Sequence, residues 1–353
     1  MSVDNRTTFP AIAFRQYNRT GDLLGVVSAR GTFKLARNGP LVIADTQHPL
    51  VLSDTYDGDP HGSVQTAQTD LVPFKPGTDV TFLGAAHTPT GEELKSWTCR
   101  LTVGKLSKQL RVYGPREWHA KTRKTWKGLI DRSAENALEG WELSEADPVS
   151  YVPLDWSYAI GDASDPNGAN PLGMRFPDDE SFEQRPTWPA PRIEAETDQF
   201  VSYKSKPEHH VPEGFGPVSP WWQARAQHAG TYDDQWIDER HPLLPGDFDF
   251  RFWQCAHPDL ISDPWLKGDE SFALENLLPG IPRLEGRLPN LTLGVTIDQG
   301  NGPRRGPMVL DGVHFDMRPG VGRVFLTWRT AFPWPKRQGL PRLELYPVQE
   351  ATA

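Results

Sequence analysis

Short runs rich in β-branched and aromatic residues, bounded by glycine, proline and aspartate, recur through the first 115 positions of the chain. They lie at residues 23–35, 41–44, 80–84, 97–104 and 108–114. In the run 97–104 apolar and polar residues alternate, which is the pattern of a strand with one buried face. Short strands at regular spacing are typical of a sandwich or a barrel. The pattern therefore predicts an N-terminal β lobe over residues 1–115.

The last third of the chain shows the same pattern. Strand-like runs lie at residues 271–277, 288–297, 308–317 and 323–329. Within the third run, Asp311-Gly312 is a signal for a tight hairpin turn. A turn followed by a strand at 267–275 echoes the one at 76–84, although turn residues also recur by chance for physical reasons. These features predict a second β lobe over residues 266–353.

The middle of the chain is less regular. Residues 116–160 form a connecting segment that periodicity assigns equally well to a helix or to a long hairpin. Residues 161–265 hold a proline-dense stretch from Pro186 to Pro220 and predict an irregular strap over the fold. The predicted fold is therefore mainly β: two β-sandwich-like lobes joined by a long irregular Pro/Gly-rich strap, with few short helices.

Composition limits the kind of protein this is. The 353 residues include 13 Trp and 16 Phe, enough aromatic side chains to build a core. The formal net charge is −9, which argues against nucleic acid as a partner because phosphate binding needs clustered cations. No apolar run approaches the roughly 20 residues of a membrane span, so no membrane insertion is expected. The N-terminal residues show no secretory signal, and we expect a cytoplasmic protein.

The sequence offers little for catalysis. It contains no nucleophile elbow, phosphate-binding loop or zinc-binding helix motif. Cys99 and Cys255 are far apart and are most simply reduced, half-buried or buried thiols. The pair His209-His210 has no further metal ligands at a defined spacing. We therefore expect no enzyme activity, no catalytic residues, no metal and no cofactor.

A second hypothesis is that the protein binds or cleaves carbohydrate. Glu239, Asp247 and Asp249 lie near Trp236 and Trp253 in the sequence, and paired carboxylates beside aromatic platforms are features of glycosidases. The same aspartates can instead hold turns and pair with arginines. A carbohydrate-active or carbohydrate-binding β protein is thus the second hypothesis.

The densest block of unusual sequence runs over residues 209–258. Its second half reads Ala-Gly-Thr-Tyr-Asp-Asp-Gln-Trp from residue 229 and Gly-Asp-Phe-Asp-Phe-Arg-Phe-Trp from residue 246. We expect Thr231 to cap a short helix over residues 232–240, limited downstream by Pro242. Arg240 and Arg251 are expected to pair with nearby aspartates and so to fix the fold of this block.

This block resembles a bacterial family. In that family a pattern P-x-G-[FY]-G-P is followed by A-G-T-Y-D-x-x-W-x-x-x-R-x-P-L-L-P-x-D-F-D-x-R-F-[FW], which residues 230–253 match almost without a gap. Residues 148–161 resemble a second family motif, from which the chain departs at Ser157 and at the next residue after this range, Asp162. Residues 170–173 resemble its N-P-x-G motif, and residues 75–80 and 103–114 also fit. The resemblance covers about residues 30–333.

The family that this chain resembles is a domain of unknown function encoded beside genes for PAAR-repeat proteins, VgrG spikes and toxins. Its members are regarded as adaptors or chaperones of type VI secretion effectors. The resemblance implies a non-catalytic protein that binds an effector toxin, a PAAR-domain protein or the VgrG spike. The motif residues implied as structural or partner-binding are Asn170, Gly173, Tyr232, Asp233, Trp236, Arg240, Pro242, Asp247, Phe248, Asp249, Arg251 and Trp253.

Overall fold

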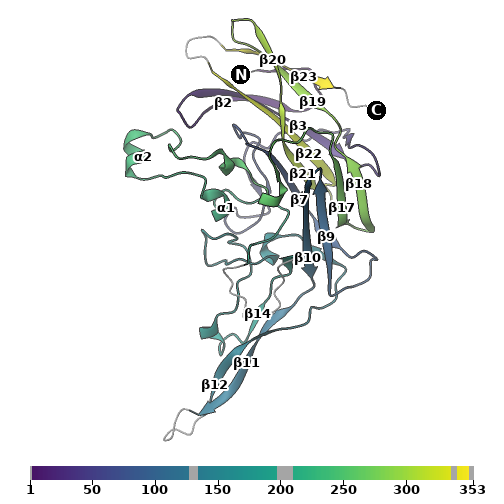
Figure 1. Ribbon diagram of the computed structural model, residues 1–353, viewed down its shortest axis with the longest axis vertical. Helices are drawn as coiled ribbons and strands as arrows, with labels where there is room; N and C mark the ends of the chain where they lie inside the picture. The colour runs from purple at the N-terminus through teal and green to yellow at the C-terminus, as the bar shows by residue number, and fades with distance from the viewer. Residues whose placement is uncertain (1, 127–133, 197–209, 335–339, 350–353) are drawn as a thin grey trace.

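The computed structural model describes residues 2–126, 134–196, 210–334 and 340–349. Strands dominate it and the helices are few and short, so the prediction of a mainly-β fold is confirmed. Figure 1 shows a large β body from which a long hairpin extends at one end and a short helical arm projects at one side.

The largest sheet has seven strands. In spatial order it comprises β16 (Ile261–Ser262), β7 (Thr78–Leu83), β21 (Val309–Asp316), β22 (Arg323–Pro333), β3 (Leu23–Lys34) and β2 (Ala11–Tyr17), with β4 (Val42–Ile43) paired to β3. Neighbours in this sheet are antiparallel except β7 and β21, which are parallel. The parallel pair brings together segments more than 200 residues apart in the sequence.

The remaining strands form smaller sheets. A five-stranded sheet holds β15 (Ile193–Ala195), β10 (Leu106–Tyr113), β9 (Ser96–Val103), β17 (Ser271–Leu278) and β18 (Ile281–Arg287). A four-stranded sheet holds β1 (Asp4–Asn5), β23 (Arg342–Gln349), β19 (Thr292–Asp298) and β20 (Pro303–Pro307). Two short pairs join β8 (Ala85–His87) to β13 (Tyr151–Pro153) and β5 (Thr55–Tyr56) to β6 (Gln65–Ala67).

The two ends of the chain share these sheets, which corrects the prediction of two separate lobes. Strand β3 lies beside β22 over ten residue pairs, and β9 pairs with β17. The predicted boundaries at 115 and 265 fall between strands, but strands from both outer segments interleave in the same sheets. Short amphipathic strands show which face is buried, but their pattern does not specify which distant strand lies beside them.

Within residues 116–160 the first part forms a hairpin, while residues 151–158 form β13 and η1. Strands β11 (Glu117–Trp126) and β12 (Ala134–Leu143) are antiparallel, with a register shift beside Gly140, and β14 (Thr187–Pro189) adds a third strand at the base. Trp118, Trp141 and Trp188 form a small core of their own there. The hairpin extends away from the body (Figure 1), and its residues 127–133 lie outside the described part of the chain.

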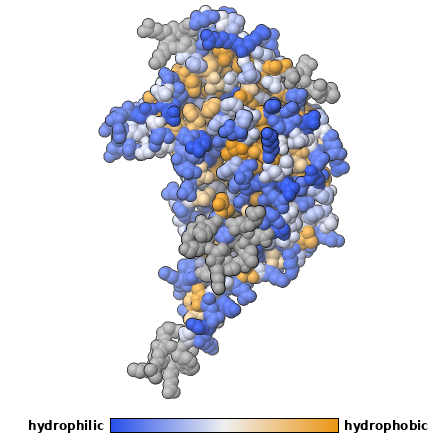
Figure 2. Space-filling model, in the orientation of Figure 1, coloured by the Kyte–Doolittle hydropathy of each residue, from blue (hydrophilic) through white to orange (hydrophobic). Residues whose placement is uncertain are grey.

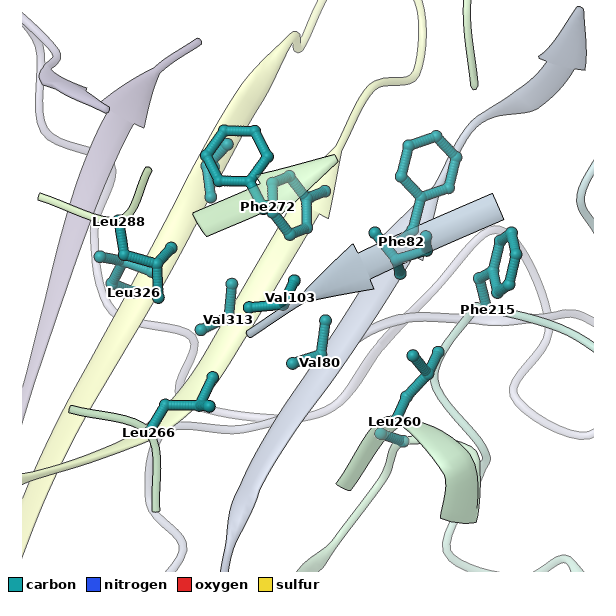
Figure 3. Packing of buried hydrophobic residues seen from close by; sticks show 14 of the residues in the cluster. Val80, Phe82, Val103, Phe215, Leu260, Leu266, Phe272, Leu288, Val313 and Leu326 are labelled. Carbon is teal, nitrogen blue, oxygen red and sulfur yellow. The ribbon is translucent and has the colours of Figure 1, made fainter. Parts of the chain in front are cut away.

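The main core lies between the two largest sheets. Val80, Val313 and Leu326 from the seven-stranded sheet are fully or almost fully buried, as are Val103 and Phe272 from the five-stranded one. Figure 3 shows these side chains gathered in one layer. Leu260 and Phe215, which come from the irregular middle of the chain, join the same cluster. The strap therefore contributes side chains to the core.

The pair Asp311-Gly312 does not make the predicted hairpin turn. It lies inside β21, where the register shifts between Leu310 and Gly312 against β22. The chain reverses instead at residues 317–322, where Gly320 and Gly322 have positive φ. An Asp-Gly pair suits a bulge as well as a turn, because glycine tolerates the local backbone at both.

The strap, residues 161–265, is built from short pieces. After the 3-10 turn η1 (Trp156–Tyr158) it contains η2 (Asp179–Ser181), α1 (Gln223–Ala226), α2 (Asp234–Glu239), η4 (Phe250–Trp253) and η5 (Pro258–Leu260), besides β14, β15 and β16. Residues 197–209 of the predicted proline-dense stretch lie outside the described residues.

Candidate partner-binding site

The seven-stranded sheet buries polar side chains on the face opposite its apolar core. Arg30 on β3, Asp79 on β7, Asp311 on β21 and Arg329 on β22 are each at most 6% exposed. Alternation along a strand would place such residues in water if the sheet had one free face. Here the strap and the segment 44–77 cover them. We call this set, with Asp70 and Lys75, the buried charged layer.

Oppositely charged partners neutralise the buried charged layer. Lys75 Nζ lies 2.7 Å from Asp79 Oδ2, and Arg30 NH1 lies 3.4 Å from Asp70 Oδ2. Arg329 pairs with Asp311 and also donates to the Asp70 carbonyl oxygen at 3.2 Å. Burial raises the pKa of Asp311, while Arg329 opposes that effect. Such pairs are costly to break singly, because the remaining charge stays in a poorly solvated site.

The strap is hydrogen-bonded directly to this layer. The backbone N–H of Cys255 donates to Asp79 Oδ2 at 3.0 Å. Directly after the strap, the N–H of Leu266 donates at 2.8 Å to the hydroxyl of Thr78, the residue before Asp79. The indole of Trp265 donates to the Lys75 carbonyl oxygen at 3.0 Å. The Lys75-Pro-Gly-Thr-Asp motif and the end of the 209–258 block, distant in sequence, thus form one structural unit.

Asn170 and Gly173 have a structural position. The buried amide of Asn170 donates to the carbonyl oxygens of Trp156 and Ile160 at 2.8 and 2.9 Å. A Cβ on Gly173 would lie 2.7 Å from the Cα of Gly161, so only glycine allows the two backbones to approach this closely. The N-P-L-G motif therefore locks the end of the 148–161 motif.

The two departures from the family motif are accommodated locally. The Asp162 N–H donates to the Asn170 carbonyl oxygen at 3.1 Å. Its carboxylate accepts the N–H and hydroxyl of Ser164 at 2.9 and 2.6 Å. The Ser157 N–H donates to Asp155 at 2.8 Å, within the cap of η1. The side chain of Asp162 thus holds this turn.

Residues 228–249, which we call the arm, project from the body and carry α2 (Figure 1). Asp233, and not the predicted Thr231, caps the helix by accepting the Trp236 N–H at 2.8 Å. Thr231 instead donates its N–H and hydroxyl to Asp247 at 3.0 and 2.8 Å, closing the base of the arm. These hydrogen bonds hold the pKa of Asp247 below its usual value.

Trp236 organises the inside of the arm. Its ring lies 4.7 Å from Tyr232 and 5.2 Å from His241, edge to face in both cases. Its indole N–H donates to the Leu243 carbonyl oxygen at 2.9 Å. Pro242 lies in the turn between these partners, after a cis peptide bond with His241. The loop after α2 is thereby folded back onto the helix.

Arg240 ties the arm to the body, but not through a carboxylate as expected. Its guanidinium donates to the Leu244 carbonyl oxygen at 3.0 Å and to the Arg19 carbonyl oxygen at 2.7 Å. Arg19 lies in the turn between β2 and β3. A Cβ on Gly21 in the same turn would lie 2.9 Å from Leu243. The arm therefore packs against the end of the edge strand β2.

Asp249 and Arg251 form the expected pair. Two guanidinium nitrogens of Arg251 lie 2.8 and 2.5 Å from Asp249 Oδ2, and these contacts lower the pKa of Asp249. Asp249 also caps η4 by accepting the Arg251 N–H at 2.9 Å. Phe248 beside it is 1% exposed, and its ring lies 6.1 Å from that of Trp253. These residues anchor the base of the arm.

Several side chains of the arm are exposed to solvent. Tyr232 and Ile237 are 53% and 57% exposed. Around them stand four exposed carboxylates, and Figure 2 shows the arm as mostly hydrophilic surface. These carboxylates are Asp233, Asp234, Asp238 and Glu239. Ile237 was not singled out from the sequence. The signal that could have identified it as exposed is its position among polar residues of a short helix.

The groups considered for catalysis have other roles. Asp247 and Asp249 hold turns as described above, and Glu239 accepts a hydrogen bond from Gln235 at 3.1 Å. Cys99 and Cys255 are free and buried, and burial raises the pKa of Cys255 to about 12. A thiol with so high a pKa is almost wholly protonated and therefore a poor nucleophile near neutral pH.

Within the described ranges, no three His, Cys, Asp or Glu side chains are grouped so as to hold a metal ion. Of the helices described, none has the length and apolar character needed to cross a bilayer.

Comparison with known proteins gives one result. No curated protein and no solved structure matches the chain. A family model, described as an uncharacterized protein conserved in bacteria, matches residues 20–329 and so spans the sheets, the buried charged layer and the arm. The chain therefore belongs to DUF2169, a family of uncharacterized bacterial proteins.

Proposed function

We propose that this protein is an adaptor of a type VI secretion system, which binds an effector toxin and assists its loading onto the VgrG spike. The toxin, or a PAAR-domain protein associated with it, is the partner. The observation that carries the proposal is the arm, whose frame is fixed while Tyr232 and Ile237 remain exposed. Exposed aromatic and apolar side chains on a preorganised element suit binding of a protein partner.

Charge supports a partner with a basic face. From Thr231 to Asp247 the arm has five carboxylates and one guanidinium, that of Arg240. Arg240 bonds to backbone carbonyl oxygens and not to these carboxylates, and even with its charge counted the formal charge of this stretch is 1 − 5 = −4. Opposite charge on the partner would speed encounter and disfavour acidic competitors. The net charge of −9 for the whole chain acts in the same direction.

The carbohydrate hypothesis has less support. Seven tryptophans are at most 7% exposed, and five more are partly buried: Trp221, Trp236, Trp253, Trp265 and Trp334. Aromatic platforms for sugar rings need an open ring face. We therefore retain the adaptor as the single proposed function.

Co-expression with each toxin encoded beside the gene tests this proposal. Wild-type protein is expected to co-elute with one of them, over an interface larger than a standard ~1,600 Å². Ile237→Asp is expected to abolish co-elution. Leu52→Asp is the matched control, because Leu52 is 61% exposed but lies outside the arm. Loss of binding in both variants would indicate non-specific hydrophobic association and contradict a binding site on the arm.

Deletion of the gene tests the biological role. Delivery of one effector is expected to stop while the secretion tube continues to fire. Equal delivery of every effector without the gene would contradict the adaptor function.

A further inference from the structure

Among the described residues, none forms a backbone hydrogen bond with the outer edge of β2. Pro10 and Asn18, at either end of the strand, are bonded to the β3 side through Arg30 N–H to Pro10 O at 3.0 Å and Asn18 N–H to Asp22 O at 2.9 Å. Antiparallel pairing alternates, so the even-numbered residues between them also face β3. The N–H and C=O groups of Ala11, Ala13, Arg15 and Tyr17 therefore point away from the sheet.

This edge is long and its pairing with β3 is uninterrupted; Arg15 and Tyr17 are exposed along it, whereas Ala13 is buried. It spans seven residues without a register shift, about 20 Å at ~3.4 Å per residue. It contains no proline and one charged residue, Arg15. Natural proteins usually blunt an open edge, because unpaired strand groups recruit other chains.

The other described edges are blunted in recognisable ways. Strands β1, β14, β15 and β16 have only two or three residues. Strand β20 begins and ends with proline. Strand β12 has a bulge and three glutamates. Strand β18 is covered, since the Leu41 N–H donates to the Arg287 carbonyl oxygen at 2.8 Å and the Asn38 N–H to that of Glu285 at 3.0 Å. The edge of β2 has none of these protective features.

The open edge continues into the arm. Tyr17, at the end of β2, is 48% exposed. The turn that follows it is held to the arm through Arg19 and Arg240 at 2.7 Å. Figure 1 shows β2 and α2 on the same side of the molecule. A strand laid along β2 would therefore run towards the acidic surface around Ile237.

We propose that β2 binds an extended segment of the effector by β-augmentation, with the arm contacting the end of that segment. This inference rests on the proposed function for the identity of the partner, but the edge itself requires only a polypeptide. Unpaired N–H and C=O groups every second residue are matched by the backbone of another strand. The segment has about seven residues, alternates apolar with polar side chains, and carries lysine or arginine at the end beside the arm.

A selection experiment tests the edge without the toxin. The probe is a phage-displayed library of random twelve-residue peptides, selected on wild-type protein. Enriched peptides are expected to alternate apolar and polar residues, to carry basic residues, and to bind Arg15→Pro at least tenfold more weakly. Proline at position 15 removes an outward N–H and leaves the bonds to β3 in place. Arg15→Ala is the matched control, because it loses the side chain and keeps the N–H; its binding should stay within twofold.

Amide exchange on the wild-type protein gives a second readout, which needs no variant to fold. In the free protein the amides of the exposed residues Arg15 and Tyr17 should exchange fast, while those of Phe14 and Gln16 are protected. A selected peptide should protect the first set. Absence of that protection, or equal binding to Arg15→Pro and wild type, overturns the proposal. A concentration-dependent dimer that Arg15→Pro abolishes would also overturn it, since a second copy would then occupy the edge.

The two proposals can fail separately. If edge-binding peptides are found but no neighbouring toxin binds, the adaptor function fails and the edge site stands. If a toxin binds wild type and Arg15→Pro equally, the adaptor function stands and the edge site is wrong.

Discussion

The two halves of the 209–258 block differ in their exposure to solvent. The half after the arm, around Cys255, is hydrogen-bonded to the buried charged layer through Asp79. The arm itself is mostly exposed, and its polar side chains bond to one another and to its own backbone. Both halves lie within residues 20–329, which the family model matches. One continuous segment of sequence can therefore combine an anchor and a projecting surface, and the sequence alone does not separate them.

The difference has an energetic consequence. In the anchor, losing one charge leaves its partner buried and poorly solvated, which is expensive. In the arm, solvent replaces whatever a substitution removes, so the cost is small. Stability measurements should therefore separate the two halves more clearly than any sequence comparison.

Arg329→Ala should have the largest effect. It leaves Asp311, which is 1% exposed, without its cation, and it removes the hydrogen bond to the Asp70 carbonyl oxygen. Removal of one member of a buried pair costs about 3–5 kcal/mol. Chemical denaturation should show this loss, with Arg304→Ala on the exposed strand β20 as the control. The double variant Arg329→Met, Asp311→Leu should recover much of it, and equal losses in single and double variants would contradict the assignment.

A pH titration should show the next effect, again in the covered face. His314 bonds to the Thr81 hydroxyl at 2.8 Å, and burial lowers its pKa to about 3. The unfolded chain binds this proton below about pH 6.5. The unfolded state thus holds more protons between these values, and stability falls as the pH is lowered through that window.

The expected loss from His314 by pH 5 is about 2 kcal/mol, since each pKa unit corresponds to ~1.4 kcal/mol. His257, whose pKa burial lowers to about 4, adds in the same direction. His314→Gln should flatten the dependence of the unfolding free energy on pH between 6.5 and 5. An unaltered slope in His314→Gln would show that this ring titrates normally.

The difference between the halves also explains what the sequence could predict. Strand positions and the mainly-β class follow from local alternation, which β9 shows along its whole length. The pairing of β3 with β22 joins residues about 300 positions apart, and no local signal encodes it. The buried charged layer was also unpredictable, because Arg30 and Arg329 alternate with apolar residues as solvent-facing residues do. Only the covering strap makes that face an interior.

Within the block, the predictions succeeded where the interaction was short-range. The pairing of Asp249 with Arg251 spans two residues and was expected. The choice of Asp233 over Thr231 as the cap depended on Asp247, sixteen residues away, which occupies the threonine hydroxyl. The prediction for Arg240 was wrong: it donates to the Arg19 carbonyl oxygen, 221 residues away in sequence, and not to a nearby carboxylate.

Arg240→Ala should have a moderate effect and test whether the arm is fixed to the body. It removes two hydrogen bonds to carbonyl oxygens, each contributing about 1 kcal/mol before solvent replaces part of it. The melting temperature should fall by a few degrees, as measured by calorimetry, and solubility should fall with it. Arg37→Ala, at an exposed position, is the control. If Arg240→Ala melts like wild type yet loses its partner, the residue belongs to the contact surface.

Ile237→Ser should have the smallest effect on stability and the clearest effect on binding. The side chain is 57% exposed, so its removal buries nothing new and opens no cavity. Substitutions at such positions usually change the free energy of unfolding by less than about 0.5 kcal/mol. The cap at Asp233 and the ring contact between Tyr232 and Trp236 do not involve Ile237, so α2 should keep its place. The melting curve should therefore overlay that of wild type, while affinity for the partner falls at least tenfold by calorimetric titration. A variant that binds as wild type does would remove the arm from the interface, and one that melts several degrees lower would place Ile237 in the frame of the arm.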